Sequence, residues 1–289
     1  MRLLVLGANG QLGGDLIEAA AARGIAAQGA GRAEVDVADP AALAAFLDAT
    51  PFDALVNCAA LLNTEAIEGD PAPAMAVNAH APAVMAEAAA RRGARMIQVS
   101  TDYVFGGAPG RTAPLSEDAP PAPVNVYGAS KLLGETLAGL AGADVSVFRV
   151  ASTFGVRGAS GKGGNFVETM IRFGRERGKL TVVADQVMSP TSTAWAAGAI
   201  LDFLAAGGAA GVYHAVNTGA VSWFGFAQAI IARAGVAAEV LPCKAADWPS
   251  KARRPGWSAL DNGRLAGVIG PIPPWEAALD AYLKARGHT

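Results

Sequence analysis

Residues 3–13 read Leu3-Leu4-Val5-Leu6-Gly7-Ala8-Asn9-Gly10-Gln11-Leu12-Gly13, a short apolar strand followed at once by a glycine-rich turn. The amphipathic segment 15–23 comes next, and Gly24 is well placed to end it as a helix. Glycines at this spacing permit a tight turn and a close backbone approach, so that a pyrophosphate can bind the free N–H groups of the helix. The stretch therefore predicts a dinucleotide-binding strand, turn and helix, with a glycine turn that only serves packing as the alternative.

A second strand is predicted over residues 25–28, and Arg32 follows its end. NAD sites usually carry an acid here for the ribose 2′-hydroxyl, whereas an arginine suits the 2′-phosphate of NADP. Arg32 therefore favours NADP, with an exposed structural arginine as the alternative. The run Val35-Asp36-Val37 predicts a third strand, where Asp36 and Val37 meet the adenine end of the dinucleotide. Asp36 can instead cap the helix predicted over residues 40–47.

Strands and helices then alternate along the first half of the chain. The fourth predicted strand, 54–60, runs into Cys58, Ala59 and Ala60, whose small side chains leave room for a cofactor or suit plain close packing. Strands over 96–100 and 145–150, a helical turn over 71–78 and helices over 82–92 and from residue 127 continue the pattern. The alternation predicts an α/β fold with a doubly wound parallel Rossmann sheet.

Polar side chains follow the fifth strand, where an α/β sheet usually presents its chemistry. They are Ser100, Thr101, Asp102 and Tyr103. Further on, Tyr127 and Lys131 stand four residues apart at the start of a predicted helix, so that both side chains share one face. A lysine in that place is expected to lower the pKa of the phenol by favouring phenolate, so that the tyrosine exchanges a proton near neutral pH.

The second half of the chain departs from the regular alternation. Asn165 and Glu168 resemble a capping box for a helix that ends near residue 177. Strands are predicted over 180–183, 213–216 and 238–241, and helices over 193–205 and 222–234; Trp223, Phe224 and Phe226 are expected in the core. We therefore predict an NAD(P)-binding domain over 1–150 with returning segments near 184–216, and a smaller mixed α/β substrate-binding domain from 151–183 and 217–289.

Composition excludes several other classes of protein. The chain has 289 residues, 52% of them hydrophobic and 17% charged, as expected of a globular protein with ample core. A formal charge of −2, with no long basic run, argues against binding to nucleic acid or to an anionic membrane. Cys58 and Cys243, the only cysteines, and the three histidines lack metal-ligand spacing, so no metal site is expected. With no apolar stretch of membrane-spanning length, a cytoplasmic enzyme is expected.

The sequence resembles the extended short-chain dehydrogenase/reductase superfamily and, within it, the dTDP-4-dehydrorhamnose reductases and their sugar-nucleotide-binding relatives. The glycine turn and Tyr127-Gly128-Ala129-Ser130-Lys131 mark the superfamily. The motifs typical of the narrower family are Ser100-Thr101-Asp102-Tyr103-Val104-Phe105, Asn165-Phe166-Val167, Asp185-Gln186 with Ser189-Pro190-Thr191, Ser222-Trp223-Phe224, and Arg254-Pro255 with Ser258 and Leu260-Asp261.

The resemblance implies reduction of a 4-keto-6-deoxyhexose attached to a nucleoside diphosphate, with NADPH as the hydride donor and NADH possible. It implies that Thr101 hydrogen-bonds the substrate oxygen, Tyr127 protonates that oxygen, and Lys131 holds the nicotinamide ribose. The remaining substrate positions that it implies are Asp102, Tyr103, Ser152, Asn165, Gln186 and Arg254. The planar fork of Arg254 suits a diphosphate, although Arg253 and Arg254 can also be a solvated pair.

Two positions depart from the family pattern. Ser152 stands where the family commonly has a tryptophan that packs on the sugar, and Met188 replaces a frequent glycine. Because serine cannot supply an aromatic platform, the identity of the sugar stays open. Two other functions also stay open: a non-catalytic dinucleotide-binding regulatory protein, and an epimerase or dehydratase that retains its NAD. A monomer or homodimer is expected.

Overall fold

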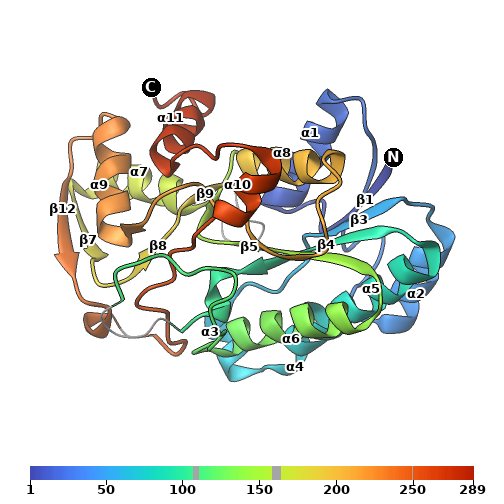
Figure 1. Cartoon of the computed structure of the whole chain (residues 1–289). Coiled ribbons are helices and arrows are strands. Elements are labelled where there is room, and N and C mark those ends of the chain that lie inside the picture. The colour runs from blue at the N-terminus through green and yellow to red at the C-terminus, as the bar shows by residue number, and fades with distance from the viewer. Residues whose placement is uncertain (107–110, 158–163, 249) are drawn as a thin grey trace.

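The computed structural model describes residues 1–106, 111–157, 164–248 and 250–289, and a six-stranded sheet lies at its centre (Figure 1). The strand order is β10-β5-β4-β3-β1-β2, and every neighbouring pair is parallel. The strands are β1 (Arg2–Leu6), β2 (Ala26–Ala30), β3 (Ala54–Asn57), β4 (Arg95–Thr101), β5 (Asp144–Val150) and β10 (Gly211–His214). The prediction of a doubly wound parallel sheet is confirmed.

Helices cover both faces of this sheet (Figure 1). One face carries α1 (Gln11–Ala22), α8 (Thr193–Ala205) and α10 (Gly263–Ile269); the other carries α2 (Pro40–Ala49), α5 (Ala81–Arg92) and α6 (Val126–Leu140). Successive residues of β1 serve the two cores in turn, since Leu3 and Val5 pack with α1 and α8 while Leu4 and Leu6 pack on the other side. Burial on both faces explains why residues 3–6 of β1 are all apolar.

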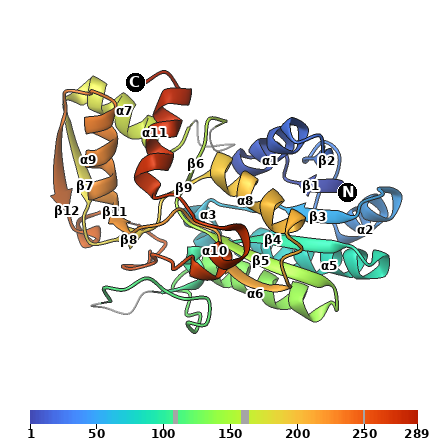
Figure 2. The same cartoon turned by 45° about the horizontal axis from the view of Figure 1, so that its top comes forward.

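A second group of elements, which we call the smaller lobe, lies beside the sheet (Figure 2). It comprises α7 (Phe166–Arg177), β7 (Lys179–Val183), α9 (Trp223–Arg233), β12 (Glu239–Cys243) and α11 (Trp275–Ala285). Strands β7 and β12 pair in parallel, and the lobe has its own core around Phe226, Ile230 and Leu279. Short strand pairs join the lobe to the sheet: β6 (Thr153–Phe154) with β9 (Thr191–Ser192), and β8 (Val187–Met188) with β11 (Val221–Ser222).

Short helical segments complete the described chain. They are α3 (Thr64–Gly69), α4 (Ala72–Ala74), a π-helical turn η1 (Met75–His80), and the 3₁₀ turns η2 (Asp102–Val104) and η3 (Ala245–Asp247). In the described residues, no helix combines the length and the apolar character needed to cross a bilayer.

Local hydrogen bonding explains where the structure departs from the expected elements. The predicted third strand, 35–37, is wrong: the Val35 amide donates back to the Gly31 carbonyl, and Asp36 accepts a bond from the Ala38 amide, so a turn forms instead. The alternative role of Asp36, as the cap of this helix, is wrong, because Asp39 caps α2 by accepting from the amides of Ala41 and Ala42.

At the starts of α1 and α7 the structure differs in detail from the prediction. Helix α1 begins at Gln11 rather than at residue 15, so it starts directly in the glycine turn. Asn165 caps α7 as predicted, accepting from the Glu168 amide at 3.1 Å. The Glu168 carboxylate does not return the bond, because it accepts from the Tyr282 hydroxyl and the Arg286 guanidinium of the C-terminal segment.

Helix α6 is fixed to the sheet by a buried ion pair. Tyr127, Lys131 and Glu135 follow one another at intervals of four residues and form its buried face. Glu135 accepts from Arg149 of β5, with 3.0 Å from Nε to Oε1 and 2.7 Å from Nη2 to Oε2. The Arg149 and Glu135 side chains are only 4% and 6% exposed. This fork-shaped contact sets the rotation of α6 on the sheet and hence the direction of Tyr127 and Lys131.

We predict that Glu135→Ala lowers the free energy of unfolding by about 3 kcal/mol, because it leaves the Arg149 charge buried without a partner. Urea denaturation monitored by circular dichroism measures this loss. Asp48→Asn, which removes an exposed carboxylate paired with Arg91 at 3.0 Å, is the control and should change stability by no more than about 0.5 kcal/mol. A loss below about 1 kcal/mol for Glu135→Ala would contradict the anchoring role.

Candidate active site

The glycine turn between β1 and α1 brings the backbone of two loops into close contact. Gly7 adopts φ +77°, and a Cβ atom there would lie 2.6 Å from the Ala59 nitrogen. A Cβ atom on Gly13 would lie 2.3 Å from the Gly7 carbonyl oxygen. Only glycine fits either position. Gly10, the N-cap of α1, offers no side chain to the first N–H groups of the helix, which are left to bind an anion.

The turn lies at the point of the sheet where the strand order reverses, between β1 and β3. The half-buried Cys58, Ala59 and Ala60 follow β3 at the same edge. Two buried polar atoms near this edge, Gln11 Oε1 and Ser100 Oγ, have no hydrogen-bond partner among the described residues. Because buried polar atoms are almost always hydrogen-bonded, these atoms and the open helix start fit a bound dinucleotide.

Arg32 lies in the exposed turn after β2. Among the described residues it forms no salt bridge, so its guanidinium is available to a ligand. Its neighbour Asp36 is exposed and bonded to the Ala38 amide, and Val37 lies in the following turn. The side chain of Asn9 lies close to Gly31, where a Cβ would meet its Nδ2 atom at 2.3 Å. Asn9 and Gly31 therefore form one continuous surface with the turn that carries Arg32.

Thr101 at the end of β4 and Tyr127 and Lys131 on α6 lie together at this edge. Lys131 Nζ donates to the Val99 carbonyl at 2.7 Å, and the Tyr127 phenol adjoins the Thr101 hydroxyl, which donates to Asp102 Oδ1 at 3.2 Å. Burial lowers the pKa of Lys131 to about 8, although Glu135 and Cys58 oppose the shift. Burial raises the pKa of the Tyr127 phenol above its ordinary value, against the hydrogen bond from Thr101.

The expected effect of Lys131 on Tyr127 is therefore wrong for this structure. Loss of solvation raises the pKa of Tyr127 by more than any contact lowers it. The ammonium group of Lys131 is directed to the Val99 carbonyl instead of the phenol. A raised pKa keeps Tyr127 protonated at neutral pH. The phenol is thus prepared to donate a proton, not to remove one.

Asp102 and Tyr103 continue from Thr101 in the turn η2. Asp102 is buried and accepts from the Ser258 hydroxyl at 2.5 Å. This contact gives Ser258, one of the residues in the family motifs, a structural role. Burial raises the pKa of Asp102 to about 6 despite that bond. The Tyr103 ring meets the Tyr127 ring edge to face at a centroid distance of 5.7 Å. Tyr103 therefore lies between the group of Thr101, Tyr127 and Lys131 and the smaller lobe.

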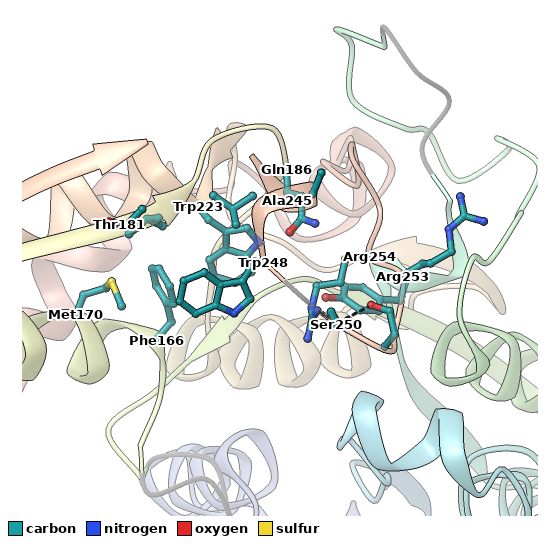
Figure 3. A pocket seen from close by; sticks show the side chains of 15 residues that line it. Phe166, Met170, Thr181, Gln186, Trp223, Ala245, Trp248, Ser250, Arg253 and Arg254 are labelled. Atoms are coloured by element: carbon teal, nitrogen blue, oxygen red, sulfur yellow. Dashed lines mark hydrogen bonds between the residues drawn. The ribbon is translucent and has the colours of Figure 1, made fainter. Parts of the chain in front are cut away.

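Beyond Tyr103 is a cavity of about 720 Å³ in the smaller lobe (Figure 3). Phe166, Trp223 and Trp248 lie close together in one part of it, and Ser250, Arg253 and Arg254 lie in another. Phe166 and Trp223 pack at a centroid distance of 4.6 Å, whereas Trp248 is 62% exposed. The cavity thus combines an aromatic wall with a cationic end, which suits a ligand with a flat ring and an anionic group.

The predicted substrate residues fall into two groups. Tyr103, Gln186 and Arg254 line the cavity. Asn165 does not, and its amide is occupied, since Nδ2 donates to the Gly155 carbonyl at 2.9 Å and to Tyr282 at 3.0 Å. Ser152, which also lies outside the lining, has φ +44°, a left-handed conformation that non-glycine residues seldom adopt. Their substrate roles stay predictions.

Most of the cavity wall consists of residues that the sequence did not indicate as ligand-binding. Trp223 packs against the core of the smaller lobe, as expected, but also lines the cavity together with Phe166, Met170 and Trp248. Phe166 follows the helix cap Asn165, and Trp248 is an exposed aromatic side chain in a segment with little regular structure. The exposure of Trp248, which often marks a binding surface when the side chain is large and aromatic, is visible only in the folded chain, so the sequence held no signal for it.

The parallel sheet carries a glycine turn at its switch point, and a buried group of Thr101, Tyr127 and Lys131 lies beside a cavity. These features together are those of an oxidoreductase of the dinucleotide-dependent short-chain type. A family model described as the RmlD substrate binding domain matches residues 1–287. The chain belongs to this family, as its motifs indicated.

Curated and solved relatives agree with the assignment. dTDP-4-dehydrorhamnose reductases of Burkholderia thailandensis and Mycolicibacterium smegmatis are 39% and 38% identical, over 96% and 100% of this chain and 97% and 87% of theirs. The crystal structure of the Bacillus anthracis dTDP-4-dehydrorhamnose reductase in complex with NADP has a TM-score of 0.90 and 32% identity, over 98% of this chain and 99% of that chain. The reductase prediction is thereby favoured over the regulatory and cofactor-retaining alternatives.

We predict that the buried charge of Lys131 makes stability depend on alkaline pH. Between the folded pKa of about 8 and the ordinary value of 10.5 the folded state binds fewer protons than the unfolded state. Stability contributed by this site therefore rises as pH increases through that range. Urea denaturation at several pH values measures the free energy of unfolding of both proteins. Between pH 7.5 and 10, the value for wild type should rise by at least about 1 kcal/mol relative to the value for Lys131→Met.

Lys284→Met, at an exposed position of α11, is the matched control and should show no such trend. A difference between wild type and Lys131→Met that stays constant with pH would contradict the buried charge.

Proposed function

We propose that this protein is an NADPH-dependent reductase of a nucleotide-linked 4-keto-6-deoxyhexose, similar in activity to the dTDP-4-dehydrorhamnose reductases. The observation that carries the proposal is the edge-to-face contact of Tyr103 with Tyr127. Through it, the group Thr101, Tyr127 and Lys131 adjoins a cavity large enough for a nucleotide sugar.

The residues present account for each requirement of ketone reduction. The bound nicotinamide would supply the hydride to the carbonyl carbon. Negative charge then develops on the carbonyl oxygen, and the Tyr127 phenol, kept protonated by burial, donates its proton there. The Thr101 hydroxyl donates a hydrogen bond to the same oxygen. Lys131, protonated below a pKa of about 8, holds the ribose hydroxyls.

The cavity supplies places for the rest of the substrate. The nucleobase packs against the aromatic wall of Phe166, Trp223 and Trp248. The diphosphate lies at the cationic end, where the fork of Arg254 matches two phosphate oxygens. The sugar then reaches past Tyr103 to Tyr127. This order places the large, non-reacting part of the substrate in the smaller lobe and the ketone at the edge of the sheet.

The finer expectations about organisation belong to the same proposal. We infer an NAD(P)-binding domain from 1–150 with 184–216, and a substrate-binding domain from 151–183 and 217–289. Helix α10 is an exception to these bounds, since its Leu265 packs in the sheet core with α8. We also propose a cytoplasmic protein that acts as a monomer or homodimer.

The proposed activity is tested with purified protein, a panel of nucleotide-linked keto-sugars including dTDP-4-dehydrorhamnose, and NADPH oxidation followed by absorbance. We predict turnover for wild type and a loss of kcat by a factor of about 10² to 10⁴ for Tyr127→Phe, because only the proton donor is removed. NADPH affinity of the variant, measured by fluorescence, should be unchanged.

Two outcomes would contradict this. Wild type that binds NADPH but oxidises it with no ketone of the panel would favour a regulatory role. Tightly copurified NAD without net redox change would favour an epimerase or dehydratase.

Cofactor preference provides a separate prediction. Arg32→Ala should raise the KM for NADPH about tenfold, because a charged contact with the 2′-phosphate is lost, and leave the KM for NADH within about twofold. Steady-state kinetics with both cofactors measures the difference. Arg91→Ala, which removes an exposed arginine paired with Asp48 on the far helices, is the control. Equal effects on NADPH and NADH would exclude Arg32 as the selective contact.

A further inference from the structure

A single carboxylate on α3, that of Glu65, joins the large sheet to the cavity wall of the smaller lobe. Its partners are the Ser250 hydroxyl, the Lys251 amide at 2.8 Å and Arg254 Nη2 at 3.0 Å. All three donors belong to residues 250–254, which are distant from Glu65 in sequence. We call residues 250–254 the cationic wall, because Ser250, Ala252, Arg253 and Arg254 line the cavity.

The cationic wall contains no helix or strand, so its shape depends on contacts from outside. Besides Glu65, the side chain of Asn125 donates from Nδ2 to the Arg253 carbonyl at 2.7 Å. Asn125 is also the N-cap of α6, the helix that carries Tyr127 and Lys131. On the same α3, Glu68 accepts from the Val126 amide at the start of α6 at 2.7 Å. Helix α3 thus holds both the catalytic helix and the cationic wall.

Arg254 is oriented by this arrangement. Its Nη2 donates to Glu65 and its Nη1 to Ser250, and its charge opposes the rise in the pKa of Tyr103 that burial causes. Figure 3 shows Ser250 and Arg254 side by side in the cavity, where Arg254 Nη1 donates to the Ser250 hydroxyl. A guanidinium has five N–H groups, so Arg254 keeps donors for a further anion while Glu65 holds it in place.

Charge alone does not explain the contact. The side chains of Glu65 and Arg254 are 42% and 32% exposed, and a pair in such a position contributes little to stability. The hydrogen bond from Ser250 and the backbone bond from Lys251 hold the pKa of Glu65 at about 2. The carboxylate therefore stays ionised and bound to the wall at physiological pH, which suits a positioning role better than a stabilising one.

We propose that Glu65 is a positioning residue for substrate binding: it fixes the cationic wall and directs Arg254 toward the diphosphate of the nucleotide sugar. This inference rests on the proposed function for the identity of the anion. It adds a residue outside the cavity that controls affinity for the nucleotide part of the substrate without contact to the ketone. Preorganisation of this kind lowers the cost of ordering Arg254 when the ligand binds.

The test compares Glu65→Ala with wild type in the full chain. We expect the KM for dTDP-4-dehydrorhamnose and the inhibition constant of dTDP each to rise by about tenfold, with kcat and the dissociation constant of NADPH within about twofold. Glu65→Gln, which keeps an acceptor oxygen, should give an intermediate effect. Asp48→Asn removes an exposed carboxylate whose pair with Arg91 has the same 3.0 Å length, and should change none of these constants.

Combining Glu65→Ala with Arg254→Met distinguishes a positioning role of Glu65 from a merely structural one. If Glu65 acts through Arg254, the double variant should bind dTDP no more weakly than Arg254→Met alone, within about twofold. Additive losses, an unchanged KM for Glu65→Ala, or tighter dTDP binding by that variant would each overturn the inference. Failure of wild type to reduce any keto-sugar would instead overturn the proposed function, while the direct dTDP measurement would still test Glu65.

Discussion

The ion pair between Glu135 and Arg149 is the constraint on which the site depends. It lies inside the molecule, where an unpaired charge would be costly, and its three hydrogen bonds fix the rotation of α6 on β5. Lys131 and Tyr127 occupy the same face of the helix one and two turns earlier, respectively. Once Glu135 is fixed, both are directed to the end of β4, where Thr101 stands.

Close packing of backbone supports that placement. A Cβ atom on Gly128 would lie 2.1 Å from the Tyr103 carbonyl oxygen, and one on Gly134 the same distance from the Asn78 carbonyl oxygen. The glycines therefore allow α6 to lie directly on η2 and η1. This proximity brings Tyr103 against Tyr127 and makes the polar turn after β4 part of both the catalytic group and the cavity. Buried packing thus determines where the proton donor meets the substrate.

Much of the sheet and the catalytic group could be predicted from the sequence, because each follows from local patterns. Glycine spacing, apolar runs and the interval from Tyr127 to Lys131 are properties of neighbouring residues. The run 35–37 was misjudged because its polar neighbours form turn hydrogen bonds that compete with a strand. The pKa of Tyr127 was misjudged because burial, which no short motif reveals, outweighs the hydrogen bond that stabilises phenolate.

The cavity was harder to predict because distant segments build it. Phe166, Trp223 and Trp248 come from α7, α9 and the segment after η3, and only the folded lobe brings them together. The same is true of Glu65 and Arg254, whose contact joins a short helix near the sheet to a wall without regular structure. The group of Thr101, Tyr127 and Lys131 is therefore encoded by local patterns, whereas the cavity depends on contacts between distant segments. A substitution at a contact such as that of Glu65 with Arg254 would therefore change the wall of the cavity without touching Thr101, Tyr127 or Lys131.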